Sequence, residues 1–337
     1  MLALTLVVEP GQVAKSLAVT EAEGDDLVGG LRAHGRRLFV VYSVLTSLGI
    51  GAIWLLGAQF FDAVIYGFAA ISTGGFAPYD GSLAPLGSAG ISVMVILVCL
   101  LGSFPLVLYH TLYQGKFQRD ANVYQVQTLV LGCMFVSLVL GLSMWFMQGM
   151  PLAEALYHAP LIAVSAQSTA GFSTMPLSEL NSLSKGVLIV AMAVGGGVGS
   201  TAGGFKILRL LIFLRVLSVT VSRASLTRSA VLEPRLAGSR LLDGDIREAL
   251  ALILLFVLVV IVSWIAFIAY GNDPFDSLFE VVFATGTVGL SVGITSGELP
   301  TFFKSVLCAD MLMGRLEILA WLVVIYPRTW IGQRLEV

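Results

Sequence analysis

Three tetrapeptides of the form threonine, any residue, glycine and a hydrophobic residue hold the groups in this sequence best suited to chemistry. In an extended Thr-x-Gly segment the main-chain carbonyl oxygens lack internal partners, and such oxygens can replace the hydration shell of a monovalent cation. The glycine permits backbone angles that a Cβ atom would penalise. The residues predicted to form this ion selectivity filter are Thr73, Gly74 and Gly75, Thr169, Ala170 and Gly171, and Thr287, Val288 and Gly289.

Each tetrapeptide closes a short apolar segment that begins with an acidic residue. The segments are 61–76, 153–172 and 275–290, and their acids are Asp62, Glu154 and Asp276. From acid to threonine is 11 residues in the first and third segments and 15 in the second, about one further helical turn. We predict three re-entrant pore helices whose acids cap the helix N-termini rather than bind ions. Packing of small residues between membrane helices is the alternative explanation of the glycines.

The composition restricts the class of protein. Of the 337 residues 57% are hydrophobic and 12% are charged, and the mean hydropathy is +0.92. A soluble domain carries about 25% charged residues, and its core stops growing near about 250–300 residues. A net charge of −2 argues against a nucleic-acid partner. We therefore expect a polytopic protein of the lipid bilayer. No Ser/His/Asp, paired-carboxylate or cysteine constellation suggests catalysis, so we expect neither an enzyme nor a covalent cofactor.

Long apolar stretches predict six crossings, because about 20 apolar residues span the bilayer as a helix. Four are uninterrupted, at 38–61, 81–115, 121–152 and 249–270, and two are interrupted, at 186–217 and 301–327. Fifteen of the nineteen lysines and arginines lie in alternate connecting segments. Basic residues mark the cytoplasmic side of membrane proteins. We therefore expect those segments to be cytoplasmic.

The fifth span collapses into glycine between Gly195 and Gly204. Each glycine costs about 1 kcal/mol relative to alanine in a helix, so this segment cannot hold a stable helix. It is no nucleotide motif, because it lacks GK[ST] and fits no GxGxxG register. Non-helical backbone at membrane depth survives where it lines a water-filled cavity or is buried in protein. We predict a loop that lines the aqueous path below the filter, with a passive helix kink as the alternative.

Arg315 is the most informative charge within the spans. A cation near the middle of a membrane is costly unless it is paired or hydrated. Glu317, two residues away, cannot face Arg315 on the same helix. We predict that Arg315 contacts carbonyls or hydroxyls of the 195–204 loop, with a helix–helix salt bridge as the alternative. Lys206 is expected to extend to the cytoplasmic interface.

These motifs together resemble the membrane subunit of the Trk/Ktr/HKT superfamily of potassium transporters, over residues 38–330. STGGF (72–76), STAGFST (168–174) and GTVGLS (286–291) are similar to the filters of the second, third and fourth repeats of that family. GGGVGSTAGGFKILR (195–209) and MGRLEILAWLVVIYP (313–327) resemble its glycine-rich break and its last helix. The resemblance implies a gate formed by Gly195, Gly196, Gly197, Gly199, Ser200, Thr201, Gly203, Gly204, Lys206 and Arg315.

The resemblance also implies an all-α fold of helix–pore loop–helix repeats around one pore. The family has four repeats and this sequence holds three, so we expect a fragment or a gene start placed too far downstream. A chain that borrows its fourth quadrant is the alternative. The expected divisions are 1–37, a remnant of repeat one with a linker; 38–116, repeat two; 117–218, repeat three with a broken second helix; 219–245, a cytoplasmic linker; and 246–337, repeat four.

The function implied is uptake of K⁺ across the plasma membrane, which would be the inner membrane of a bacterium. Glycine at all three filter positions favours K⁺ over Na⁺, and K⁺ would be the transported ion. The resemblance implies a homodimer and a cytoplasmic nucleotide-binding subunit of the RCK type. The alternatives are a non-conducting truncated paralogue that regulates or assembles with a transporter, and a Na⁺-conducting or poorly selective transporter.

Overall fold

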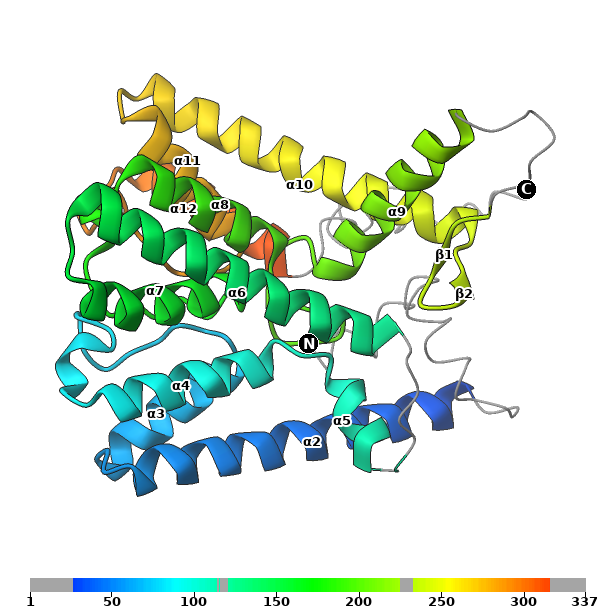
Figure 1. Ribbon diagram of the computed structural model, residues 1–337, viewed down its shortest axis with the longest axis horizontal. Helices are drawn as coiled ribbons and strands as arrows, with labels where there is room; N and C mark the ends of the chain where they lie inside the picture. The colour runs from blue at the N-terminus through cyan, green and yellow to red at the C-terminus, as the bar shows by residue number, and fades with distance from the viewer. Residues whose placement is uncertain (1–26, 114, 116–120, 225–232, 316–337) are drawn as a thin grey trace.

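The computed structural model describes residues 27–113, 115, 121–224 and 233–315 and shows a mostly helical chain (Figure 1). Its described α-helices are α2 (Leu27–Leu55), α3 (Phe60–Ile71), α4 (Ala89–Gly102), α5 (Leu106–Tyr113), α6 (Ala121–Gln148), α7 (Leu152–Gln167), α8 (Ser182–Val194), α9 (Ile207–Ala224), α10 (Asp243–Ala269), α11 (Pro274–Thr285) and α12 (Thr301–Arg315). Two 3₁₀ turns, η1 (Ala84–Leu86) and η2 (Leu177–Glu179), and an antiparallel pair, β1 (Arg235–Leu236) and β2 (Ser239–Arg240), complete it. The prediction of an all-α fold is confirmed.

One arrangement of helices occurs three times along the chain. A long helix leads to a short helix and then to a further helix, as α2–α3–α4, α6–α7–α8 and α10–α11–α12. Figure 1 shows these three units stacked from the blue and cyan part of the chain, through green, to yellow and orange. The short helices α3 and α11 have 12 residues and α7 has 16. The additional turn predicted for the second segment is therefore present.

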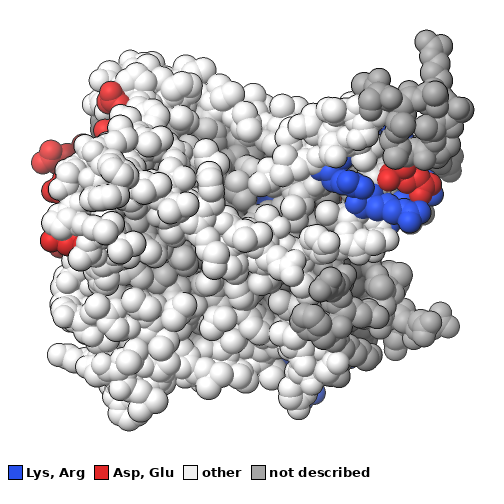
Figure 2. All heavy atoms as spheres, in the orientation of Figure 1, with Lys and Arg blue, Asp and Glu red and all other residues white. Residues whose placement is uncertain are grey.

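The described helices have the lengths and composition of membrane spans. Three are long and apolar enough to cross a bilayer, at Gly35–Leu55, Ala121–Gln148 and Asp243–Ala269, and the bent pair α4–α5 would be a fourth. Figure 2 shows a broad uncharged belt between acidic side chains at one end and a group of basic and acidic side chains beside the β1–β2 hairpin at the other. The predicted last span continues to residue 327, and its part beyond Arg315 lies outside the described residues.

The predicted uninterrupted span over residues 81–115 is wrong. Helix α4 ends at Gly102, α5 begins at Leu106, and the two are bent by 85°. Pro105 explains the break, because it has no N–H to donate and disfavours a helical conformation in the residue before it. The first span, predicted over 38–61, lies at Gly35–Leu55 in α2, so it ends earlier than predicted.

Numbered after the repeats that the sequence predicts, α2–α3–α4 is the second unit, α6–α7–α8 the third and α10–α11–α12 the fourth. The second and fourth units pack their helices together in the same way. A Cβ atom at Gly102 of α4 would lie 2.6 Å from the carbonyl oxygen of Ile71, the last residue of α3. A Cβ atom at Gly314 of α12 would overlap the carbonyl oxygen of Thr285, the last residue of α11. Only glycine allows this approach, so α4 and α12 cross directly against the C-terminal ends of the two short helices.

The acids at the starts of the short helices do not cap them as predicted. Asp62 and Asp276 lie in the first turns, where the helix dipole favours a negative charge. The N-cap of α11 is instead Asp273, whose carboxylate accepts from the N–H groups of Phe275 and Asp276. Asp62 accepts from the Tyr79 hydroxyl at 3.0 Å. Asp276 forms an ion pair of 2.7 Å with Lys185 of α8, and Glu154 is exposed in the first turn of α7.

Candidate functional site

The three Thr-x-Gly segments share one backbone conformation. Thr73, Thr169 and Thr287 have positive φ angles of 48°, 55° and 52°, which non-glycine residues rarely adopt. Glycines two residues later have φ angles of 70°, 82° and 90°. In each segment the threonine N–H donates three residues back, and the next N–H donates five residues back into the short helix. This is a Schellman ending with threonine where glycine is usual.

The segments also lie side by side. A Cβ atom at Gly75 would lie 2.5 Å from the carbonyl oxygen of Ala170. A Cβ atom at Gly171 would overlap the carbonyl oxygen of Val288 and lie 3.3 Å from the Cα atom of Gly289. Thus the glycine of the second unit abuts the segment of the third, and the glycine of the third abuts that of the fourth.

The main-chain carbonyls of all nine predicted filter residues accept no hydrogen bond from any residue of the described chain. Five of the nine residues are buried, namely Thr73, Thr169, Ala170, Gly171 and Val288. Buried carbonyls in proteins almost always have a partner. A group of unpaired carbonyls gathered from three segments is therefore suited to binding a cation.

The glycine-rich loop lies against the filter threonines. The Gly203 N–H donates to the Thr169 hydroxyl at 2.6 Å, and a Cβ atom at Gly203 would overlap both Gly286 O and Thr287 Oγ1. The Thr201 hydroxyl donates to the carbonyl oxygens of Ile71 at 2.7 Å and of Gly102 at 2.9 Å. In all three units the loop therefore contacts the end of the short helix or the Thr-x-Gly segment that follows it.

Two glutamine side chains and one backbone carbonyl from the interruption between α4 and α5 bind the first part of the loop. The Gln167 side-chain amide, at the end of α7, donates to the carbonyl oxygen of Gly195 at 2.8 Å. The Gln125 side chain of α6 accepts from the Val198 N–H at 2.7 Å. The carbonyl freed at the α4–α5 break, that of Ser103, accepts from the Gly197 N–H at 3.0 Å. The break in one unit thus supplies an acceptor for the loop of the next.

Replacement of Gln167 by leucine is expected to lower the free energy of unfolding by about 1–3 kcal/mol, because the Gly195 carbonyl loses its donor in a buried site. The measurement is the thermal unfolding midpoint of the detergent-solubilised protein. Gln127→Leu on α6 is the matched control, since Gln127 is exposed. Equal midpoints for the two variants would show that this bond does not hold the loop.

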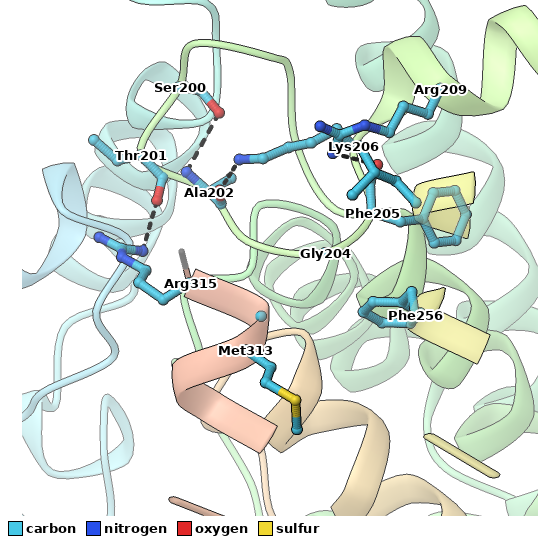
Figure 3. Close-up of a pocket in the computed structure, with 12 residues that line it drawn as sticks. Ser200, Thr201, Ala202, Gly204, Phe205, Lys206, Arg209, Phe256, Met313 and Arg315 are labelled. Atoms are coloured by element: carbon cyan, nitrogen blue, oxygen red, sulfur yellow. Dashed lines mark hydrogen bonds between the residues drawn. The ribbon is translucent and has the colours of Figure 1, made fainter. Parts of the chain in front are cut away.

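Arg315 and Lys206 contact the loop from different sides (Figure 3). Arg315 Nη1 donates to the carbonyl oxygen of Thr201 at 2.8 Å, so the predicted contact of this arginine is confirmed. Lys206 Nζ donates to the carbonyl oxygen of Ala202, four residues back. The prediction that Lys206 extends to the cytoplasmic interface is wrong, because its ammonium group folds back onto the loop.

These two cations border a small pocket of about 50 Å³ beside the loop. The pocket is lined from the loop, from α10 by Leu252 and Phe256, and from α12 by Met313 and Gly314. All ten predicted gate residues therefore come together here or in the adjoining loop. Glu317, which the sequence excluded as a partner of Arg315, lies outside the described residues.

The sequence did not predict the residues that support the site. The two glutamines at 125 and 167 hold the loop, and Glu280 of α11 is fully buried beside the fourth filter segment. A signal for Glu280 was present, because it is an ionisable residue in the middle of the apolar short helix α11, beyond the first turn that holds Asp276. An ionisable residue at membrane depth is expected to have a function.

The three units of helices, the apolar belt and the long apolar helices are those of a polytopic membrane protein. The chain belongs to the TrkH family of cation transport proteins, which matches residues 14–329. The resemblance drawn from the motifs is therefore confirmed. Because the family consists of transport proteins, the expectation that the chain is not an enzyme is confirmed as well.

Individual relatives agree with this assignment. A cation transporter of Methanocaldococcus jannaschii is 29% identical over 324 residues, which is 96% of this chain and 66% of the relative. The Trk system potassium uptake protein TrkH of Escherichia coli is 30% identical over 305 residues, 88% of this chain and 62% of the relative. The chain thus spans less than two thirds of the length of these relatives.

A solved structure supports the fold. The crystal structure of the potassium transporter TrkH from Vibrio parahaemolyticus superimposes with a TM-score of 0.80 at 25% sequence identity. The match covers 93% of this chain and 69% of that chain. The helices described above therefore have the arrangement of a solved potassium transporter.

Proposed function

We propose that this protein takes up K⁺ across the plasma membrane through a filter formed by its Thr-x-Gly segments. The observation that carries the proposal is the set of unpaired carbonyls on the nine filter residues. Carbonyl oxygens replace the water around an alkali cation at little cost when the backbone already holds them in place. The Schellman endings provide that order, because each fixes its threonine and the following residue to the short helix.

The glycine-rich loop is the proposed gate. It lies against the filter threonines through Gly203 and against the end of α3 through Thr201. Opening would require these hydrogen bonds to break, each with a net contribution of about 0.5–1.5 kcal/mol. Small uncharged residues can move with little steric cost, and the bond from Arg315 to the Thr201 carbonyl would favour the closed position.

The charge distribution and the relatives support a proposal for the orientation of the protein in the membrane and for its partners. We place the end that carries the lysine and arginine side chains of Figure 2 in the cytoplasm, because basic residues favour that side. The Escherichia coli relative is named as part of a Trk system. On this basis we propose a homodimer that works with a cytoplasmic nucleotide-binding subunit of the RCK type, docked near α9 and the β1–β2 hairpin.

The test is ion uptake by proteoliposomes that contain the complete gene product. With an inside-negative potential, ⁸⁶Rb⁺ is expected to accumulate. The concentration of unlabelled K⁺ that halves this uptake is expected to be at least about tenfold lower than the corresponding concentration of Na⁺. Protein-free liposomes are the control. Equal competition by the two ions would instead support a poorly selective or Na⁺-conducting transporter. Folded protein without uptake would support a non-conducting regulatory subunit.

A further inference from the structure

Glu280 lies in the middle of α11 and is fully buried. Its carboxylate accepts five hydrogen bonds. Oε1 accepts from the Ser291 hydroxyl at 2.7 Å and from three successive backbone N–H groups, those of Val292 at 2.9 Å, Gly293 at 3.2 Å and Ile294 at 3.3 Å. Oε2 accepts from the Thr295 hydroxyl. A buried charge is tolerated when its acceptor capacity is filled in this way.

The five donors belong to one segment, residues 291–295, which begins two residues after the filter glycine Gly289. This segment has no helix or strand to order it. Three consecutive amides that converge on one oxygen fix its path, so the carboxylate determines where the fourth filter segment leaves the filter. Gly289 itself is exposed and has only Gly171 near its missing side chain, at 4.0 Å.

The other two short helices hold their filter segments with fewer bonds. Tyr66 of α3 donates to the Ser82 carbonyl at 2.7 Å, and it lies seven residues before its filter threonine, as Glu280 does. His158 of α7 shares a hydrogen bond of 2.8 Å with the Thr174 hydroxyl. Asp62 of α3 accepts one bond, from Tyr79. Glu280 thus makes the most extensive contact of this kind in the described chain.

We propose that Glu280 is a positioning residue for ion selectivity, which it exerts by fixing residues 291–295 and through them the carbonyls of Thr287, Val288 and Gly289. This role rests on the proposed function. A filter discriminates between K⁺ and Na⁺ by the number and position of its carbonyls, so freedom in one of the segments lowers the discrimination more than the conduction.

The experiment compares Glu280→Gln with Glu298→Gln in the complete gene product, by uptake of ⁸⁶Rb⁺ and ²²Na⁺ into proteoliposomes. Both variants lose one carboxylate, but Glu298 is exposed in the irregular stretch that follows residues 291–295. Glu280→Gln is expected to lower the ratio of ⁸⁶Rb⁺ to ²²Na⁺ uptake by about tenfold, the change that a loss of about 1.4 kcal/mol produces. The ratio of Glu298→Gln should equal that of the wild type.

Hydrogen–deuterium exchange provides the structural readout. The amides of Val292, Gly293 and Ile294 are expected to exchange about tenfold faster in Glu280→Gln and at the wild-type rate in Glu298→Gln, since only the first variant weakens their acceptor. If Glu280→Gln is not recovered folded, Ser291→Ala removes one donor to the same carboxylate and should lower the uptake ratio by about threefold, or about 0.65 kcal/mol.

The outcomes separate the two proposals. A selective wild type together with an equally selective, folded Glu280→Gln overturns the role of Glu280 and leaves the proposed function intact. If Glu280→Gln lowers the uptake of both ions in proportion, so that their ratio is unchanged, the role in selectivity is also overturned and Glu280 is purely structural. A folded wild type that transports neither ion contradicts the proposed function itself, and the role of Glu280 with it.

Discussion

Replacement of Gly171 by alanine is expected to reduce ⁸⁶Rb⁺ uptake at least about tenfold and to abolish the preference for K⁺ over Na⁺. Two effects act together at this position. The φ angle of 82° penalises any residue with a Cβ atom, by about 1–2 kcal/mol. The new methyl group would also overlap the carbonyl oxygen of Val288, so that one filter segment must displace another. Serine at this position should have the same effect, since it also carries a Cβ atom.

The measurement is competition of K⁺ and Na⁺ with ⁸⁶Rb⁺ uptake in proteoliposomes. Gly51→Ala on α2 is the matched control, because a Cβ atom there has nothing within 4 Å. That control should conduct as the wild type does and gain helix stability of about 1 kcal/mol or less. Wild-type selectivity in a folded Gly171→Ala protein would exclude this glycine from the filter.

The sequence predicted three Thr-x-Gly segments at the ends of short helices because a bilayer allows few arrangements of a polypeptide. Backbone at membrane depth must be helical, buried or beside water. Three Thr-x-Gly segments, each between a half-length apolar segment and a longer apolar stretch of the sequence, therefore had few possible structures. The positive φ angles at Thr73, Thr169 and Thr287 were not predicted, because threonine rarely adopts them. They belong to the Schellman endings, in which each threonine occupies the position that glycine usually holds.

The parts that the sequence did not predict depend on contacts between distant segments. Pro105 in the sequence is consistent with a helix break, but only the structure shows that the break frees the Ser103 carbonyl to accept from the Gly197 N–H. Lys206 was expected to extend to the interface on the basis of its length alone, whereas the free carbonyl of Ala202 lies within its reach. The role of Glu280 could not be predicted, because it depends on the position of residues 291–295 beside its carboxylate.

The supports around the filter differ in chemistry from unit to unit. Tyrosine and histidine hold the segments of the second and third units, and a carboxylate holds that of the fourth. Among the described residues, the glycine-rich loop likewise follows the last helix of the third unit only. It nevertheless contacts residues of all three units. A common backbone conformation has therefore been combined with distinct side-chain supports. Substitutions at equivalent positions should consequently differ in effect from unit to unit.

Replacement of Arg315 by methionine is expected to increase ⁸⁶Rb⁺ uptake about tenfold. The substitution removes the bond of 2.8 Å to the Thr201 carbonyl and a positive charge beside the proposed ion path, while methionine keeps most of the side-chain volume. Hydrogen bonds from charged groups contribute about 1.5–3 kcal/mol, and about 1.4 kcal/mol corresponds to a factor of ten. The closed position of the loop should lose that advantage over the open one.

The initial rate of uptake is the quantity to compare, at equal protein in the vesicles. Arg240→Met is the control, because Arg240 pairs with Glu233 at 3.0 Å on the exposed β1–β2 hairpin, where ion pairs contribute little. Arg315→Lys should fall between the wild type and Arg315→Met, since lysine keeps the charge but not the planar guanidinium group. The selectivity for K⁺ should stay unchanged in all three variants, because the filter carbonyls are untouched. A folded Arg315→Met protein that conducts no faster than the wild type would show that this arginine does not hold the gate closed.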